Sequence, residues 1–243
     1  MKIVGIIAAG GSGERLGLAG GKQMLSVCGR PVAAWAIDAL AGAELIQELI
    51  VVCDPARVEE YSTTLSAAIR TEKPVAFVPG GATRAESVCA GLDYAKDADI
   101  VAIHDGARPL LDPKDANACL QYFLDDCDAD GIVLGTPAVD TLKRVGDYYV
   151  QETPDRSVYW QAQTPQVFWH DQLVKAYKQA KEDAYHGTDD ASYLERRGGN
   201  IVMVPGSRAN IKITTAEDLE FVGLLLASRI SEQAEQEKAA NGI

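Results

Sequence analysis

The sequence is poor in the side chains that carry nucleophilic and metal chemistry. It holds three histidines and five cysteines among 243 residues, and no two cysteines form a C-x-x-C pair. A Ser/His/Asp triad therefore has weak support, and a metal-ligand cluster or a disulfide framework has none. Scattered thiols on apolar segments are typical of buried free cysteines in a reducing compartment, so we expect a cytoplasmic protein. The five are Cys28, Cys53, Cys89, Cys119 and Cys127.

Positive charge is scarce as well. The 23 lysines and arginines face 35 aspartates and glutamates, which gives a formal net charge of −12. Such a chain lacks the basic surface that nucleic acids and anionic membranes require, so we expect neither as a partner. If the substrates are phosphates, the positive charge must be local. The first 30 residues supply it: four cations minus one acid give +3, from Lys2, Arg15, Lys22 and Arg30 against Glu14.

Long apolar runs are missing too. None reaches the roughly 18 residues that suggest a membrane span. The chain opens on a strand-like apolar run instead of the basic and apolar regions of a secretory signal, so we expect no signal peptide. An apolar content of 47% with 24% charged residues is ordinary for a globular protein.

What is present is an alternation of apolar strand patterns with amphipathic helical patterns. Strands are predicted at residues 3–8, 49–53, 75–78, 100–103 and 131–135, and helices from residues 31, 58, 83 and 112. This order predicts an α/β fold, with a Rossmann-like, mostly parallel sheet and helices on both faces. Ligands of such sheets bind beyond the carboxyl ends of the strands. We therefore expect the loops at 8–22, 80–87 and 105–108 to converge on one site.

The pattern changes between residues 136 and 164. Two β-type segments, 141–145 and 148–152, flank Gly146-Asp147, which predicts a hairpin with a two-residue turn. Its exposed aromatic residues favour a protruding β-hairpin arm at about 136–164 over a part of the main sheet. No repeat or linker interrupts the rest, so we expect one domain over residues 1–243.

The last third of the sequence returns to regular patterns. Helices are predicted near residues 170–184 and after Thr188, and strands at 201–204 and 210–214. Thr214 and Glu217 have the spacing of a capping box, which predicts the start of a final helix. We expect the polar tail beyond about residue 232 to fray.

A glycine-rich loop follows the first strand. Small residues at 8–13 let backbone N–H groups approach an anion closely, and the loop then delivers Arg15 and Lys22. The dinucleotide fingerprint fails at Leu16, and a Walker A loop fails because Gln23 follows Lys22. The loop predicts a nucleotide phosphate site in which the two cations neutralise charge on a phosphoryl group. The alternative is a structural turn with two solvated cations.

The acid that ends the fourth predicted strand is a second candidate. Asp105 follows the apolar run 100–103 and precedes Gly106, which favours a metal ligand or a general acid or base. A turn or helix cap is the alternative. We interpret the neighbouring His104 as a packed residue at the strand end.

These segments together carry a resemblance to a known family. In order along the chain, the motifs are 8–15 (AAGGSGER), 22–23 (KQ), 80–88 (GGATRAESV), 104–109 (HDGARP), 140–141 (DT), 163–166 (QTPQ), 188–192 (TDDAS) and 210–214 (NIKIT). The chain resembles the 2-C-methyl-D-erythritol 4-phosphate cytidylyltransferases, enzymes of non-mevalonate isoprenoid synthesis. The likeness covers residues 3 to about 222 and depends on at least seven separate motifs.

The resemblance implies a role for each matching residue. It assigns CTP binding to Ala8, Ala9, Gly10, Gly81 and Ser87, and catalysis to Arg15, Lys22, Arg156 and Lys212. It assigns the methylerythritol phosphate to Asp105, Arg108, Thr141, Arg156, Thr164, Thr188 and Lys212. It makes Asp105 the acid associated with Mg²⁺, and it implies a homodimer whose arms reach into the partner's site. Ala82 departs from members that carry an aspartate beside the base.

The implied reaction agrees with the residues. A phosphate oxygen of the acceptor attacks the α-phosphorus of CTP and pyrophosphate leaves, so CMP is transferred. An anionic nucleophile needs no general base, and alignment with charge neutralisation is enough.

Two alternatives stay open. One is ribitol-5-phosphate cytidylyltransferase, which Gly106-Ala107 and the segment 188–192 disfavour. The other is a nucleotide-binding module without turnover. The joint presence of Arg15, Lys22, Asp105 and Lys212 argues against a pure binder.

Overall fold

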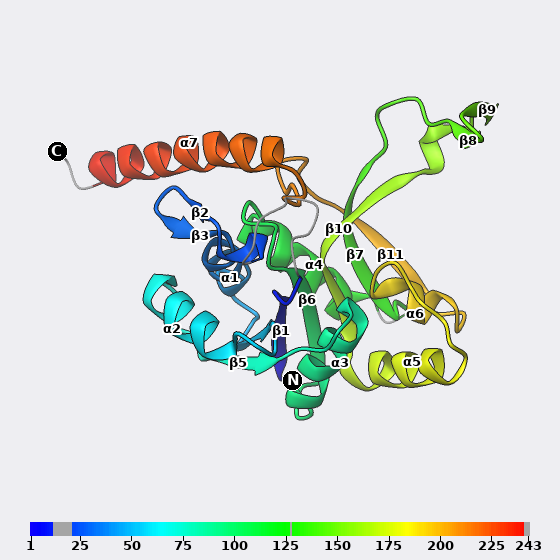
Figure 1. Cartoon of the computed structure of the whole chain (residues 1–243), viewed down its shortest axis with the longest axis horizontal. Coiled ribbons are helices and arrows are strands. Elements are labelled where there is room, and N and C mark those ends of the chain that lie inside the picture. Colours follow the sequence, from blue (N-terminus) through cyan, green and yellow to red (C-terminus); the bar gives the residue numbers. More distant parts are fainter. Residues whose placement is uncertain (12–20, 127, 241–243) are drawn as a thin grey trace.

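A seven-stranded sheet forms the centre of the computed structural model, which describes residues 1–11, 21–126 and 128–240 (Figure 1). The strand order is β11-β7-β10-β6-β1-β4-β5. The bounds are β1 Ile3–Ala8, β4 Glu48–Cys53, β5 Val75–Pro79, β6 Ile100–Asp105, β7 Gly131–Pro137, β10 Trp160–Trp169 and β11 Ile201–Pro205. All neighbours pair in parallel except β10, which runs antiparallel to both β6 and β7. The predicted mostly parallel α/β sheet is confirmed.

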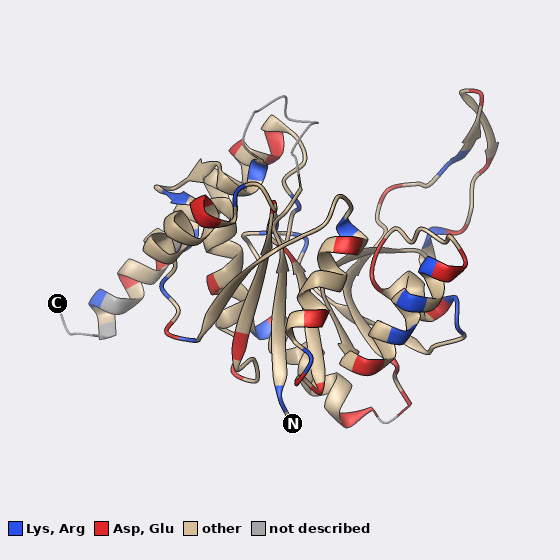
Figure 2. Ribbon diagram, turned by 60° about the horizontal axis from the view of Figure 1, so that its bottom comes forward, with Lys and Arg blue, Asp and Glu red and all other residues tan. Residues whose placement is uncertain are grey.

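Helices cover both faces of this sheet. They are α1 Val32–Ala41, α2 Val58–Ala68, α3 Arg84–Tyr94, α4 Pro113–Asp125, α5 His170–Glu182, α6 Ala191–Glu195 and α7 Ala216–Ala240, with 3₁₀ turns η2 at Lys22–Met24 and η3 at Arg156–Val158. Buried residues of α1, α2 and α4 pack in one apolar cluster against the strands, and those of α3, α5 and α6 pack in a second. Figure 2 shows that the charged residues gather on helices and loops, while most of the sheet is uncharged.

Side-chain caps mark the starts of α3, α4 and α7. Thr83 and Glu86 form a capping box at α3, and the Asp112 carboxylate accepts the Lys114 N–H at 2.9 Å at the start of α4; both helices begin where predicted. At α7 the box lies one residue later than predicted. There the Asp218 N–H donates to the Thr215 hydroxyl at 3.2 Å, and the Thr215 N–H donates to the Asp218 carboxylate at 2.9 Å.

Two predictions about the last third of the chain were wrong in detail. Residues 210–214 do not form a strand: they contact the turn after β6, with the Ile213 N–H donating to the Ala107 carbonyl at 2.9 Å. The polar tail beyond residue 232, which we expected to fray, is helical to Ala240. The first turns of α7 cover β2 (Ser26–Val27), because Val222 and Leu226 pack on Val27 in a third apolar cluster.

The hairpin arm is shorter than predicted. β7 continues to Pro137 and β10 begins at Trp160, so only the segment between them leaves the sheet, projecting away from the body of the molecule (Figure 1). Its two strands, β8 Arg144–Gly146 and β9 Tyr149–Glu152, pair antiparallel. The turn is Asp147-Tyr148 and not Gly146-Asp147. Both turn residues have positive φ, 48° and 67°, as in the type I′ turns that match strand twist.

The expectation of buried cysteines holds only in part. Cys53 and Cys119 are buried, but Cys28 is exposed, and Cys127 lies outside the described residues. Cys28 (φ 47°) and Gly29 (φ 76°) form the turn between β2 and β3 (Arg30–Pro31), and the Cys28 thiol lies 3.5 Å from the Gly223 carbonyl of α7. A thiol on an apolar segment is therefore not always a core residue.

A buried polar contact joins the central strands β6 and β10 at the end nearest the site. His104 is fully buried, with Nδ1 at 2.8 Å from the Thr164 hydroxyl and Nε2 at 3.1 Å from the Arg108 carbonyl. Burial lowers the pKa of His104 to about 4. The neutral ring packs at the strand end, as predicted, and the Thr164 hydroxyl also accepts the Asp105 N–H at 3.1 Å.

This histidine predicts a fall in stability with acid. In the unfolded chain a histidine takes up a proton near pH 6.5, whereas in the folded protein His104 takes one up only near pH 4. Between these values the unfolded state binds more protons, so the free energy of unfolding falls as the pH is lowered, by up to about 3 kcal/mol. Denaturant unfolding between pH 7.5 and 4.5 measures it. His104→Asn should start lower but vary less with pH, and an equal slope in both proteins would contradict this assignment.

Candidate active site

A pocket of about 520 Å³ opens at the carboxyl ends of β1, β5 and β6. Within the described residues most of its wall comes from three loops, and Asp54, Pro55 and Lys212 complete it. The first follows β1 and contributes Gly10 and Lys22, the second follows β5 and contributes Gly81 and Ser87, and the third begins at Asp105. The predicted convergence of these loops is confirmed for the parts that the structure describes.

The loop after β5 shapes one wall through close packing. The Gly81 N–H donates to the Ser87 hydroxyl at 3.2 Å, and the capping box of Thr83 and Glu86 holds the next turn. A side chain at Gly81 would place its Cβ only 2.3 Å from the Cβ of Glu86, so the loop can adopt this path only with glycine there. Ala82 also lines the pocket and offers only a methyl group.

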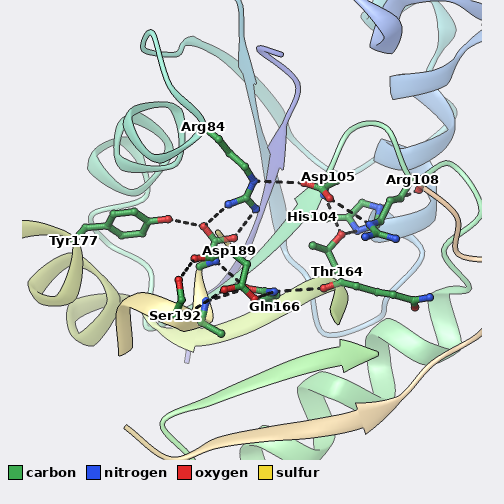
Figure 3. A network of polar contacts seen from close by, with 12 residues as sticks. Arg84, His104, Asp105, Arg108, Thr164, Gln166, Tyr177, Asp189 and Ser192 are labelled. Carbon is green, nitrogen blue, oxygen red and sulfur yellow. Dashed lines mark hydrogen bonds and ion pairs between the residues drawn. The ribbon is translucent and has the colours of Figure 1, made fainter. Parts of the chain in front are cut away.

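A single buried carboxylate, Asp105, stands among three cations at this wall. Figure 3 labels two of them, Arg84 and Arg108. Lys212 Nζ lies 2.9 Å and Arg108 Nε lies 3.2 Å from the same oxygen, and Arg84 Nε lies 3.6 Å from the other. The Asp105 side chain is 8% exposed. Burial alone would raise its pKa, but the charges of Lys212, Arg84 and Arg108 outweigh burial and hold the pKa well below the usual range. Asp105 is therefore ionised at every working pH.

Lys212 reaches this cluster from far along the chain. It lies in the segment between β11 and α7, which the Ile213 backbone contact holds against the turn after β6. Arg108 follows Asp105 by three residues, and its guanidinium also donates to the Asn210 carbonyl at 2.7 Å. Arg108 thus holds the backbone next to Lys212 as well as the carboxylate.

Arg84 leads from Asp105 to a second buried acid. Its two terminal nitrogens donate to the two oxygens of Asp190, at 2.9 and 2.6 Å, and Asp190 has no exposed surface. The Tyr177 hydroxyl also donates to Asp190, and Gln166 accepts the Asp190 N–H at 3.1 Å (Figure 3). Burial opposes the charge of Arg84, but Asp190 outweighs this effect and raises the pKa of the guanidinium.

The predicted site residues fall into three groups. Those that line the pocket are Ala8, Gly10, Lys22, Gly81, Ser87, Asp105 and Lys212. Those directly behind it are Ala9, whose N–H donates to the Val52 carbonyl at 2.9 Å, together with Thr164 and Arg108. Those that do not line it are Thr141 and Arg156 on the arm and Thr188 before α6, all of them exposed. Arg15 lies outside the described residues.

Sequence reasoning gave no role to Arg84, Asp190, Gln166 or Tyr177. The first three stand within quoted motifs, so the motifs themselves were the available signal. Tyr177 lies in the amphipathic helix α5, where an aromatic residue is normally interpreted as part of the apolar core. Nothing in its local pattern indicates the hydroxyl contact.

The acids present limit the kind of metal site. No group of three or more His, Cys, Asp or Glu side chains suited to hold a metal occurs in the part of the chain that the structure describes. Asp105 and Asp54 are the acids in the described pocket wall. Because Mg²⁺ often binds one or two carboxylates together with substrate phosphates, this wall fits a nucleotide-bound ion and not an all-protein cage.

The geometry agrees with comparisons to known proteins. The family model IspD, 2-C-methyl-D-erythritol 4-phosphate cytidylyltransferase, matches residues 3–228. A protein of that name from Pelotomaculum thermopropionicum is 37% identical over 236 residues, covering 96% of this chain and 98% of its own. One from Syntrophotalea carbinolica is 40% identical over 222 residues, covering 90% and 94%.

Solved structures give the same result. A 4-diphosphocytidyl-2C-methyl-D-erythritol synthase from Anaerococcus prevotii matches with a TM-score of 0.81 and 27% identity, covering 93% of this chain and 96% of its own. The 2-C-methyl-D-erythritol 4-phosphate cytidylyltransferase of Thermus thermophilus matches with a TM-score of 0.73 and 26% identity, covering 93% and 98%. None of the described helices combines the length and apolar character needed to span a bilayer. This chain belongs to the 2-C-methyl-D-erythritol 4-phosphate cytidylyltransferase family.

Proposed function

We propose that this chain transfers CMP from CTP to 2-C-methyl-D-erythritol 4-phosphate, releasing pyrophosphate, as a step of non-mevalonate isoprenoid synthesis. The observation that carries the proposal is the cluster at Asp105, where Lys212, Arg84 and Arg108 surround one carboxylate beside a glycine-lined pocket. The cluster concentrates positive charge where a chain of net charge −12 would otherwise repel phosphates.

The residues of the pocket suit this chemistry. The acceptor phosphate is already anionic, so the chain must align it with the α-phosphorus and neutralise the charge that develops. Backbone groups near Gly10 and Gly81, with Ala8, Ala9 and Ser87, would hold the nucleotide, and Lys22 would face its phosphates. We propose the same role for Arg15. His104, neutral and enclosed, is not a general base in this scheme.

At the acceptor end, Lys212 is the principal cation. Its ammonium lies on Asp105 at 2.9 Å, and the side chain keeps 35% of its exposure. Lys212 can therefore contact a phosphate in the pocket without leaving Asp105. We propose that Arg108, Thr164 and Thr188 complete this end of the site.

Magnesium is proposed as the cofactor. Asp105 would hold it together with the nucleotide phosphates, because its low pKa keeps the carboxylate ionised. The bound ion supplies neutralisation of the triphosphate charge. Lys212, Arg84 and Arg108 keep the carboxylate in place.

We further propose a cytoplasmic homodimer of single-domain subunits, in which each arm completes the partner's site. Thr141 and Arg156 lie on the arm, outside the wall of their own pocket. Tyr148, Tyr149 and Val158 leave large apolar surfaces exposed there, which favours burial against another chain. A pocket completed in this way would explain how two acceptor residues can stand so far from the nucleotide loops.

Lys22→Ala should lower kcat about a hundredfold while CTP binding stays within about tenfold, because the charge is needed mainly in the transition state. Steady-state kinetics and nucleotide titration measure the two effects. Lys175→Ala, an exposed lysine on α5, is the control and should retain full activity. Wild-type turnover in Lys22→Ala would remove Lys22 from the mechanism.

Pyrophosphate release with CTP and Mg²⁺ tests the acceptor. We expect release with 2-C-methyl-D-erythritol 4-phosphate, and little with ribitol 5-phosphate or without an acceptor. Release only with ribitol 5-phosphate would favour the alternative transferase. Tight CTP binding without release on either acceptor would favour the binding module.

Mixing two inactive variants tests whether the arm acts across subunits. Arg156→Ala keeps its own pocket intact, and Lys22→Ala keeps its own arm intact. A mixed dimer therefore has one complete site, and an equimolar mixture should recover about a quarter of wild-type activity. Activity after unfolding and refolding the two proteins together measures it. If the mixture stays at the level of the separate variants, the arm does not act across subunits.

A further inference from the structure

The carboxylate of Asp190 joins a loop of the pocket to a neighbouring segment outside the pocket wall. Arg84, the first residue of α3, belongs to the loop that follows β5, and Asp190 precedes α6 in the segment that carries Thr188. The two side chains form a bidentate ion pair at 2.9 and 2.6 Å. Such a fork fixes the orientation of a guanidinium, which a single contact does not. We infer that Asp190 is a positioning residue that fixes Arg84 at Asp105 and holds the Thr188 segment to the pocket.

Asp190 is itself fixed from other elements. The Tyr177 hydroxyl of α5 donates to its carboxylate, and the N–H groups of Asp190 and Ala191 donate to Gln166 Oε1 at 3.1 and 3.0 Å. Gln166 lies on β10, two residues after Thr164, whose hydroxyl accepts the Asp105 N–H. A chain of contacts thus runs from Tyr177 through Asp190 and Arg84 to Asp105. Figure 3 labels Tyr177, Arg84 and Asp105 along it.

Arg84 retains access to the pocket despite this pairing. Its side chain is 32% exposed and lines the wall, while both terminal nitrogens are held by Asp190. The remaining nitrogen, Nε, faces Asp105 at 3.6 Å. Asp190 therefore determines which atom of Arg84 faces the acid that holds Lys212.

The two loops depend on this ion pair unequally. The nucleotide loop has restraints of its own, the capping box of Thr83 and Glu86 and the Gly81–Ser87 hydrogen bond. The Thr188 segment has local bonds, such as the Ser192 N–H to Asp189 at 3.0 Å, and uncharged contacts with Gln166 of β10, which donates to Asp189 at 2.9 Å. Among the described residues, however, the Thr188 segment makes one ion pair with the pocket wall, and Asp190 supplies it. Loss of the Asp190 charge should therefore disturb the acceptor side and spare the nucleotide side.

The test compares Asp190→Asn with wild type and rests on the proposed function for its kinetic part. We expect the KM for the acceptor to rise at least tenfold, while the KM for CTP stays within about threefold. Hydrogen exchange is the second measurement, independent of turnover. We expect faster exchange of the amides at 187–191, with amides at 81–87 unchanged.

If Asp190→Asn folds poorly, two milder variants can replace it in the same measurements. Tyr177→Phe keeps the ion pair and the stacking on Tyr193, with ring centroids 4.1 Å apart, and should raise the acceptor KM by a smaller factor. Arg84→Lys keeps the charge but loses the fork, and should resemble Asp190→Asn.

A matched control comes from the Arg30–Asp38 pair. Asp38 also pairs with an arginine and accepts backbone N–H groups, from Arg70 at 2.9 Å and Thr71 at 3.0 Å, but it lies outside the nucleotide pocket. Asp38→Asn should lose stability without changing either KM.

Equal rises in both KM values, or unchanged exchange at 187–191 in Asp190→Asn, would overturn the positioning role. Absence of pyrophosphate release by the wild-type protein would instead refute the proposed function, and the exchange experiment would still decide the role of Asp190.

Discussion

A carboxylate in a nearly dry position stays ionised only if opposite charges surround it, and the site is built around that requirement. Asp105 is 8% exposed and has Lys212, Arg108 and Arg84 within 3.6 Å or less. Each cation comes from a different part of the chain: the segment after β11, the turn after β6 and the start of α3. The carboxylate therefore brings three segments to one point. The carboxylate also holds the three cations at fixed positions beside the pocket, where their charge can attract a further anionic group.

Much of the fold could be predicted because its signals are local. Alternating strands and helices, Asp112 as a cap and the loops that end β1, β5 and β6 all follow from short-range pattern. The strand β10 could not be predicted in this way. Its central residues Gln163, Thr164 and Gln166 are polar, and a buried strand is recognised by apolar residues. These polar groups are tolerated in the sheet because each has a hydrogen-bond partner: Asn210 for Gln163, Asp105 for Thr164 and Asp189 for Gln166.

The part of the site that was not predicted also depends on contacts between residues far apart in the sequence. The Arg84–Asp190 contact joins residues 106 apart, and no spacing rule states that distance. The hairpin turn was displaced for a simpler reason: Asp147 and Tyr148 accept positive φ, so the glycine beside them was not required in the turn. Motif resemblance placed Thr141 and Arg156 among acceptor residues. The pattern could not show that they lie outside the wall of the pocket.

The late position of Lys212 has a consequence for synthesis of the protein on the ribosome. Chains fold from the amino end as they emerge, and β1, β4, β5 and β6 with their glycine-rich loops are complete by residue 105. Until β11 and the segment after it dock, Asp105 lacks its nearest cation, at 2.9 Å. A nascent chain thus carries the phosphate-facing loops before it carries their full positive charge. The cation cluster around Asp105 is therefore complete only after residue 212 has been made and has docked.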